Sequence, residues 1–318
     1  MEITIDCVLN AELSGLKSDS GLANLLAKGQ VTRVEMPLEA LVCEQFRLQA
    51  TPDYPIAAIS ATVDGLDVGD AYWLRADSVH LALQRDCFSL AEPVPLLVAR
   101  KHADLLIASL NQHFAQDGLA FFVGKSGAWY LRCDKTPQIK TSLPSVAIDK
   151  NIHQFLPIGN ESSKWLAVLN EVQMLLHEHP VNETRESAGE VAANSVWLSG
   201  GGAMPQFKAL HHDVDLIIAN GVFYQGLAQL AKTPYKTLPA SLDEVLQNTA
   251  PHVRLELPQI YNLDEVWFRP LFSALKTKKI KRLTLNLGFY EKSLTIDISL
   301  IDTYKFWRKP KPVINYLE

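Results

Sequence analysis

The stretch LLHEHPVNETRESAGEVAANSVWLSGGGAMP (residues 175–205) gathers polar groups that suit an anion. Asn182 and Arg185 follow a helix-stopping proline, and a short apolar strand then enters three consecutive glycines, Gly200, Gly201 and Gly202. A guanidinium group favours the bidentate contact that carboxylate and phosphate oxygens offer. Consecutive glycines let backbone N–H groups converge on an anion. The chemistry indicated is the binding of a phosphate or a carboxylate beside a strand end.

Structural interpretations of the same residues stay open. The glycine segment matches neither G-x-x-x-x-G-K-S/T nor G-x-G-x-x-G, and it also suits a tight chain reversal. Arg185 has carboxylates close by in the sequence with which it can pair instead of binding a ligand. These are Glu178, Glu183 and Glu186.

A helix that starts near Ser162 and ends at Pro180 presents further candidates. Its apolar positions recur at helical spacing from Trp165 onward, and the remaining face offers Asn170, Gln173 and His177. His177 and His179 are two residues apart, so they point in different directions and cannot chelate one metal together. His179 continues the apolar stripe, typical of a buried residue, whereas His177 is a candidate acid, base or ligand contact. Asn194, just before the apolar strand, completes the candidate set.

The elements that must position these groups alternate between strands and helices. We expect strands over residues 3–9, 195–198 and 214–219, and a helix over 222–231 after the Asn220-Gly221 turn. The order strand, glycine turn, helix is typical of α/β layer folds. A helix over 264–275, a basic turn and two further strands complete the C-terminal part.

Residues 70–150 have a different texture, with short strands around one helix and a hairpin at residues 124–127. We therefore predict an α/β protein with a mixed, partly parallel sheet formed by residues 1–69 and 151–318. A smaller α+β domain, residues 70–150, is inserted between them. At 318 residues the chain is long enough for this organisation.

The composition of the chain limits the classes of partner that it is expected to bind. The net charge of −5 gives no general attraction to nucleic acid or to an anionic membrane, so neither is expected as a partner. The four cysteines are widely separated and lack CxxC spacing, which indicates reduced thiols rather than disulfides or a zinc site. The start MEITIDCVLN lacks the basic and apolar regions of a secretion signal. A cytoplasmic location is therefore expected.

Several separated blocks resemble the archaeal-type cofactor-independent phosphoglycerate mutases. The blocks HEHPVNETRESAGEVAANSVWLSGGGAMP and DLIIANGVFYQGLAQLAKTPY reproduce that family's N-x-x-R, small-residue AN, W-x-x-G-x-G and G-L-A features in order. YWLRAD (72–77), VHL (79–81), WYLR (129–132) and LNEVQMLLHEHPVN (169–182) are similar to a bacterial subgroup, the RpfE-type regulatory proteins. The resemblance covers residues 70–240 and implies alkaline-phosphatase-like ancestry for the fold.

The departures from the family decide the expected function. The resemblance implies phosphoryl transfer through a serine beside two metal ions held by Asp and His. Asp6 stands where a metal-binding Asp might, but the D-G-x-G-D continuation is absent. Beyond residue 212 the only histidine is His252, so the late D-x-x-G-H type motif has no counterpart. We expect no catalytic residues, metal or cofactor.

Three functions remain open from the sequence. The leading hypothesis is a non-catalytic relative that binds a small phosphorylated or carboxylated metabolite, or a regulatory protein partner. Its ligand-binding residues would be Asn170, His177, Asn182, Arg185, Asn194, Gly200, Gly201 and Gly202. The alternative is an active mutase or phosphatase that uses Asp6, His177 or His252 in a rearranged site. The third is a purely structural partner-binding protein.

Overall fold

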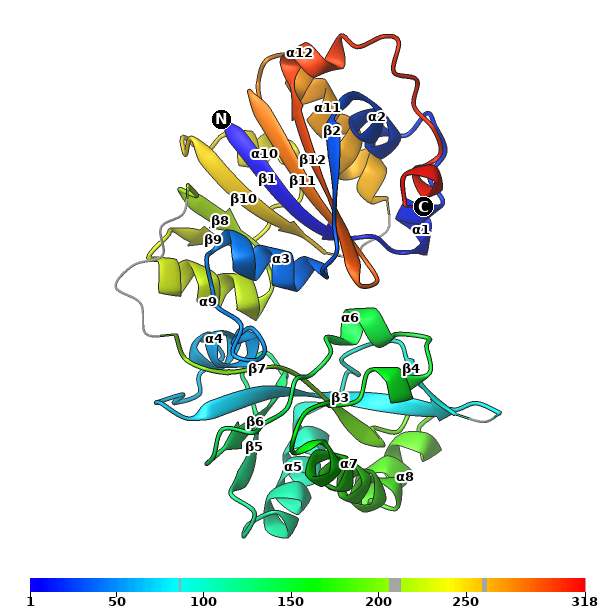
Figure 1. Cartoon of the computed structure of the whole chain (residues 1–318), viewed down its shortest axis with the longest axis vertical. Coiled ribbons are helices and arrows are strands. Elements are labelled where there is room, and N and C mark those ends of the chain that lie inside the picture. The colour runs from blue at the N-terminus through cyan, green and yellow to red at the C-terminus, as the bar shows by residue number, and fades with distance from the viewer. Residues whose placement is uncertain (86, 206–212, 259–261, 318) are drawn as a thin grey trace. The chain divides into compact units, whose positions relative to one another are not determined.

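The computed structural model describes residues 1–85, 87–205, 213–258 and 262–317. The chain divides into two compact units, and Figure 1 shows that each has its own sheet. The first unit combines Met1–Arg47 with Ala209–Glu318, and the second is the continuous segment Leu48–Lys208. Within the described ranges, each helix is too short or too polar to cross a membrane.

The first unit is built on a seven-stranded sheet in the order β2-β12-β11-β1-β10-β8-β9. Its centre is parallel, because β1 lies between β10 and β11 and runs parallel to both, and β8 and β9 extend that direction. β12 and β2 add an antiparallel edge. The predicted α/β class with a mixed, partly parallel sheet is confirmed. The strands are β1 Glu2–Val8, β2 Gln30–Val34, β8 Leu216–Ile218, β9 Tyr235–Lys236, β10 His252–Leu257, β11 Arg282–Phe289 and β12 Lys292–Ser299.

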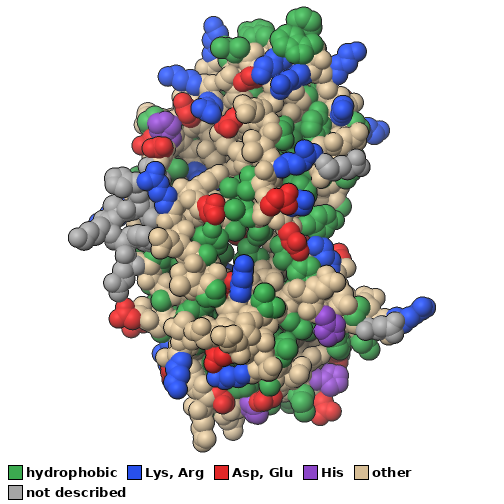
Figure 2. All heavy atoms as spheres, in the orientation of Figure 1, with side chains coloured by type: hydrophobic (Ala, Val, Ile, Leu, Met, Phe, Trp, Pro, Cys, Tyr) green, Lys and Arg blue, Asp and Glu red, His purple; other side chains and the backbone are tan. Residues whose placement is uncertain are grey.

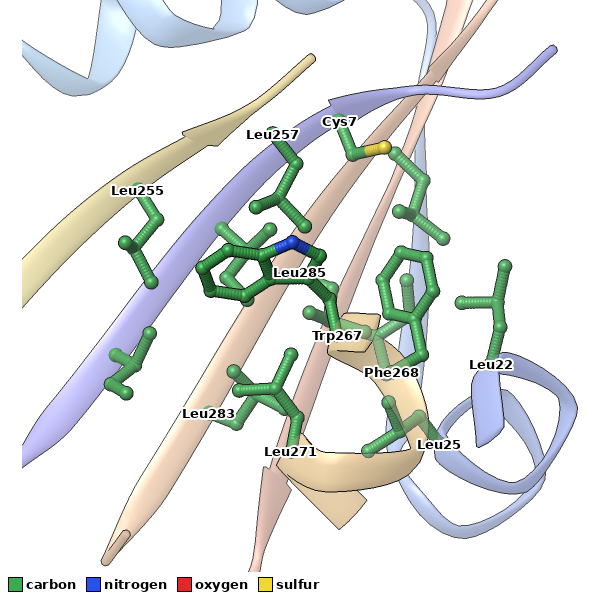
Figure 3. Close-up of a cluster of buried hydrophobic side chains, with 14 of the residues drawn as sticks. Cys7, Leu22, Leu25, Leu255, Leu257, Trp267, Phe268, Leu271, Leu283 and Leu285 are labelled. Atoms are coloured by element: carbon green, nitrogen blue, oxygen red, sulfur yellow. The ribbon is translucent and has the colours of Figure 1, made fainter. Parts of the chain in front are cut away.

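Alternation along the central strands makes the two faces of this sheet chemically different. Successive side chains of a strand point to opposite faces. One face is apolar and packs against helices α2 (Gly21–Lys28) and α11 (Arg269–Lys276), with Trp267 and Phe268 between them and the strands (Figure 3). The strand residues on this face are Ile3, Ile5, Cys7, Val253, Leu255, Leu257, Leu283, Leu285 and Leu287. The opposite face therefore receives the polar residues of the same strands.

Short helices surround the sheet of the first unit. They are α1 Ala11–Ser14, α2 Gly21–Lys28, α3 Leu38–Gln45, α9 Val222–Ala231, α10 Leu242–Leu246, η2 Asp264–Phe268, α11 Arg269–Lys276, α12 Leu300–Thr303 and η3 Val313–Tyr316. α2 begins at Gly21, where an added Cβ would lie 2.4 Å from the backbone nitrogen of Arg269. The buried Asp264 carboxylate accepts the N–H groups of Gly21 and Leu22, and so caps α2. This contact holds the two helices of the apolar face together.

The second unit is an α+β body around a long central strand, β3. β7 pairs antiparallel with most of β3, β6 and β4 pair with other parts of it, and β5 pairs with β6. The strands are β3 Tyr72–Leu83, β4 Phe88–Ala91, β5 Leu119–Val123, β6 Trp129–Cys133 and β7 Ser195–Ala203. The helices are α4 Ile56–Val63, α5 Arg100–His113, α6 Pro144–Ala147, η1 Ile152–Gln154, α7 Ser162–His177 and α8 Pro180–Ser187.

The predicted domain boundaries differ from the two units. Residues 48–69 and 151–208 lie in the second unit, not in the discontinuous α/β domain. The physical reason is pairing, because β7 adds to the sheet of β3, and the apolar face of α7 joins the same core as α5 and β6. Two local expectations also change. Pro180 begins α8 instead of a loop, and β7 continues through the glycines to Ala203.

Candidate functional site

A row of polar side chains crosses the second face of the first unit's sheet. Asp6 of β1 is in register with Glu256 of β10 on one side and Asn286 of β11 on the other. Residues in register on adjacent parallel strands project from the same face. The row lies toward the carboxyl ends of the three strands, which is where ligand and catalytic sites of open α/β sheets occur. This position makes it the principal candidate site.

Asp6 is the buried centre of this row, with 1% of its surface exposed. Its Oδ1 accepts hydrogen bonds from Arg254 Nη2 at 2.9 Å and from Asn286 Nδ2 at 2.7 Å. Its Oδ2 accepts from Arg254 Nε at 2.6 Å and from the hydroxyl of Tyr224 at 3.0 Å. A carboxylate offers about four lone-pair directions, so these donors use the full capacity of Asp6.

Arg254 reaches Asp6 from the neighbouring strand β10, two residues before Glu256 and therefore on the same face. Its Nη2 also donates to Gln45 Oε1 at 2.7 Å, and its guanidinium carbon lies 5.1 Å from the ring centre of Phe46. Burial works to lower the pKa of Arg254, but the adjacent Asp6 carboxylate outweighs it, so the net effect is a raised pKa. The side chain is a fixed cation inside the protein.

Glu256, the second carboxylate of the row, sits at the N-terminus of α9. It accepts a hydrogen bond from Gly221 N at 2.9 Å, and an added Cβ on Gly221 would lie 2.9 Å from both of its carboxylate oxygens. Burial raises the pKa of Glu256, and nearby Asp6 adds to this, although hydrogen bonds from the backbone of Gly221 and Asn220 oppose the shift. Asp6, which is buried, and Glu256, which is half-buried, are thus neighbouring carboxylates, and Arg254 pairs with Asp6.

Because the pKa of Glu256 is raised in the folded state, the free energy of unfolding should depend on pH. The folded state holds the proton of this carboxyl more tightly than the unfolded state does. The free energy of unfolding therefore falls as pH rises from the unfolded pKa, about 4.5, through the folded pKa. We therefore expect Glu256→Gln to be more stable relative to the wild type at pH 7 than at pH 4. Urea unfolding at both pH values measures this difference. A constant difference across that range would contradict the assignment.

The residues around Asp6 do not fit the two-metal site that the family resemblance implies. Each Asp6 oxygen already accepts two hydrogen bonds, and the positive charge beside it belongs to Arg254. Within the described ranges, no group of three or more His, Cys, Asp or Glu side chains is arranged to hold a metal ion. His252, at the start of β10, instead pairs through Nδ1 with Asp215 Oδ2 at 2.9 Å. The cationic group that contacts Asp6 is therefore the guanidinium of Arg254.

The predicted ligand residues lie in the second unit, and two of the asparagines bond the backbone. The buried Asn182 donates through Nδ2 to the carbonyl oxygens of Leu176 at 2.7 Å and Ala193 at 2.9 Å, and its Oδ1 accepts from Ala193 N at 3.0 Å. Asn194 pairs in the same way with the N–H and carbonyl of Leu81. Both side chains replace missing backbone partners, a structural role.

Arg185 is buried, with 3% of its surface exposed, and its contacts are internal. Nε donates to the carbonyl of Val191 at 3.0 Å, and Nη2 donates to that of Leu97 at 3.3 Å. Nη1 lies 2.8 Å from Glu190 Oε2, an ion pair without hydrogen-bond alignment. The predicted pairing with a nearby glutamate is therefore found, although the glutamate is Glu190 and not one of the three expected.

Histidines 177 and 179 have the different environments that their spacing indicated. His177 is exposed at the end of α7. His179 caps α8: its Nδ1 accepts from Val181 N at 3.2 Å, while its Nε2 lies 2.9 Å from Ser109 Oγ. Burial lowers the pKa of His179. An acceptor Nδ1 and a lowered pKa both indicate a neutral ring.

The three glycines allow close packing instead of surrounding an anion. An added Cβ on Gly202 would lie 2.8 Å from Pro55 Cα, and one on Gly200 would lie 2.9 Å from Ile56 Cβ. The start of α4 therefore rests directly on β7. Gly202 faces Trp73 across the ladder, whereas Asn194 bonds Leu81 eight residues further along β3, a separation of about 26 Å.

The eight residues predicted to bind an anion do not lie together in the structure. The separation along β3 is too large for one small molecule, and the polar atoms of the asparagines and Arg185 make internal contacts. Asn170 lines a cavity of about 180 Å³. Its other lining residues are mainly apolar and include Leu81, Phe155, Leu169 and Trp197. That lining suits an apolar group better than a phosphate.

Sequence reasoning identified Asp6 as a position of interest but missed its partners. Arg254, Asn286 and Gln45 come from three separate elements, and Arg254 is 248 residues from Asp6. A signal was present, because ITIDCV, VRLEL and LTLNLG each place polar residues among apolar ones in a strand. Alternation in central parallel strands, which are usually apolar throughout, marks a polar face.

The similar sequences found among known proteins share one enzyme name. No protein-family model matches the chain. The chain is similar to enzymes named 2,3-bisphosphoglycerate-independent phosphoglycerate mutase. The protein of Methanosarcina barkeri is 27% identical in an alignment 169 residues long, which covers 47% of this chain and 42% of that protein. The protein of Methanothrix thermoacetophila is 29% identical over 127 residues, 39% of this chain and 32% of that protein. The matches thus span less than half the length of these relatives.

Solved structures give a likeness of fold. The PH0037 protein from Pyrococcus horikoshii superimposes with a TM-score of 0.50 at 14% identity, over 94% of this chain and 87% of that one. A cofactor-independent phosphoglycerate mutase from Thermoplasma acidophilum aligns over 98% of this chain and 94% of its own, at 13% identity. Its TM-score of 0.44 does not by itself establish a shared fold. The sequence relatives support a phosphoglycerate-mutase-like origin.

Proposed function

We propose that this chain is a non-catalytic relative of the cofactor-independent phosphoglycerate mutases, of the RpfE regulatory type, and that it acts by binding a partner. The observation that carries the proposal is the buried ion pair of Asp6 and Arg254 at the carboxyl ends of the parallel strands. Four free cysteines, three of them buried, support a reducing cytoplasmic location.

The ion pair matters because of what each group can supply. Phosphoryl transfer of the family type depends on divalent cations that neutralise the attacking and leaving oxygens. Arg254 carries one charge and only hydrogen-bond donors, and it is held in place by Asp6 and Gln45. It can neither accept a proton nor lower the pKa of a bound water as a metal does. The ion pair is therefore better suited to stabilising the fold than to catalysing phosphoryl transfer.

The test combines elemental analysis with an enzyme assay on the full chain. Protein incubated with Mn²⁺ or Zn²⁺ and then desalted should hold no stoichiometric metal, and it should not interconvert 3- and 2-phosphoglycerate. An archaeal relative assayed in parallel is the positive control. Turnover that disappears in Asp6→Asn would overturn the proposal, because it would place Asp6 in a working site.

An active mutase is the second candidate, and the names of the similar proteins favour it. An active mutase would require the ion pair of Asp6 and Arg254 to break, so that Asp6 could bind a metal ion. Arg254→Ser separates the two candidates, because an active enzyme that ejects the arginine should keep or raise its metal content in this variant. A non-catalytic protein should only lose stability. Calorimetry with phosphoglycerates measures in the same samples whether a small anion binds without turnover.

A further inference from the structure

Two aromatic side chains project from a tight turn in the first unit. Arg308 N donates to the carbonyl of Lys305 at 3.0 Å, so Phe306 and Trp307 take the two central positions of the turn. Phe306 is 84% exposed and Trp307 65% exposed, and their rings pack edge to face at 5.2 Å. Ile301 of α12 and Tyr304 are 78% and 66% exposed beside them. Large apolar groups gathered in solvent indicate an interaction surface.

This turn is held firmly although its side chains are exposed. Lys28, at the end of α2, is itself buried, and its Nζ donates to the carbonyl oxygens of Lys305 at 2.7 Å and Arg308 at 2.6 Å. In return Arg308 Nη1 donates to the carbonyl of Gly29 at 2.9 Å. A buried cation thus fixes the turn from inside. The aromatic pair is displayed in a set geometry, which lowers the entropy cost of docking.

The surroundings of the turn are strongly basic. Residues 276–282 and 300–311 adjoin, because Arg282 is in register with Ser299, and together they hold seven lysines, two arginines and one aspartate. Asp243 and Asp297 pair with two of these cations, which reduces the local charge without reversing it. Figure 2 shows hydrophobic and basic side chains intermixed at the end of the first unit where Figure 1 places α12. We call these two segments the α12 surface.

The net charge of the whole chain predicts no membrane partner, but the α12 surface has the opposite local charge, and we propose that it docks on an anionic phospholipid membrane. Trp, Tyr and Phe between Lys and Arg side chains are the composition of segments that lie at a bilayer interface. The aromatic rings would enter the headgroup region, and the lysines would lie on the lipid phosphates. The whole chain has a net charge of −5, so the rest of the molecule is acidic and would be repelled. That asymmetry would orient the protein with the α12 surface toward the lipid.

The same observations favour lipid over a protein partner or a nucleic acid. Seven of the nine cations are lysines, a residue depleted in protein interfaces, where arginine is preferred. The aromatic rings stand at the tip of a projecting turn, and they pack on each other edge to face instead of forming a flat stacking platform for bases. A soft, anionic, extended surface matches this arrangement best.

Trp307 provides a direct test. The chain has six tryptophans, and Trp73, Trp129, Trp165, Trp197 and Trp267 are all at most 5% exposed. A change in tryptophan emission on contact with vesicles therefore reports on Trp307. We expect a blue shift and co-sedimentation of the full chain with vesicles of equal parts phosphatidylglycerol and phosphatidylcholine. Pure phosphatidylcholine vesicles should give neither, and high salt should release the protein.

Matched variants separate the contributions. Trp307→Phe should keep sedimentation and lose the blue shift. The double variant Phe306→Ser/Trp307→Ser should weaken vesicle binding by about tenfold or more, from the apolar area no longer buried. Leu97→Ser, an equally exposed apolar position in the second unit, is its control and should bind as the wild type does.

Charge variants complete the set. Lys309→Glu/Lys311→Glu should weaken binding by more than about tenfold. The pair Lys101→Glu/Lys135→Glu, exposed in the second unit, should change it far less. Equal binding to both vesicle types, or sedimentation with unchanged Trp307 emission, would overturn the proposal. So would binding of a single-stranded oligonucleotide that depends on Phe306 and Trp307 while vesicles are ignored.

Discussion

Arg254→Ala should lower the free energy of unfolding by about 3–5 kcal/mol, the cost of leaving a buried carboxylate without its cation. The variant removes both hydrogen bonds from Arg254 to Asp6, and Gln45 Oε1 keeps only the longer contact from Asn286 Nδ2, at 3.2 Å. Urea unfolding measures the loss. Amide hydrogen exchange in β1, β10 and β11 should rise with it, which locates the effect in the first unit.

The double variant Asp6→Leu/Arg254→Met is the control for this experiment. Replacing both members of a buried ion pair with apolar residues is often neutral, because two desolvation costs disappear together. We expect it to recover most of the stability that Arg254→Ala loses. An Arg254→Ala protein within about 0.5 kcal/mol of the wild type would show that Asp6 is free to take another cation.

Asn182→Ala should cost about 3 kcal/mol, because Ala193 loses the side-chain partner of both its carbonyl and its N–H, and the carbonyl of Leu176 loses one of its donors. The effect should appear as a lower urea midpoint for the second unit, with no ligand added. If Asn182 instead served a ligand, the free protein would be as stable as the wild type, and only ligand affinity would fall.

Asn170→Ala is the matched comparison, since Asn170 was predicted for the same ligand set but is exposed on α7. We expect its stability to change by less than about 0.5 kcal/mol. Similar losses for the two variants would contradict the structural assignment of Asn182.

Local pattern predicted much of the fold. The helix expected over residues 222–231 is α9, with the same bounds. The hairpin of β5 and β6 has glycines at both ends of its turn, and the two strands expected near the C-terminus, β11 and β12, pair antiparallel. These elements depend on neighbours in sequence, so sequence carries the information about them.

Long-range pairing was the part that could not be predicted. β7 was expected to stop before the glycines, because three glycines usually break a strand. The strand continues through the glycines because the start of α4 packs against their backbone, where a side chain would not fit. The residues of α4 and β7 that meet there are more than 140 positions apart in the sequence. The contacts of the candidate ligand residues also depend on distant parts of the chain. Asn182 and Arg185 are a sensible pair for an anion until the carbonyl groups that they bond are known.

The position of β1 between β10 and β11 determines when the first unit can form during synthesis. β1 is made first, yet both of its neighbours are encoded some 250 residues later. The second unit is one uninterrupted segment and can assemble while the ribosome is still translating. Until β10 and β11 have been synthesised, β1 has no partner strand and its apolar face is exposed. Nascent chains that stall before β11 should therefore recruit chaperones through Ile3 and Ile5.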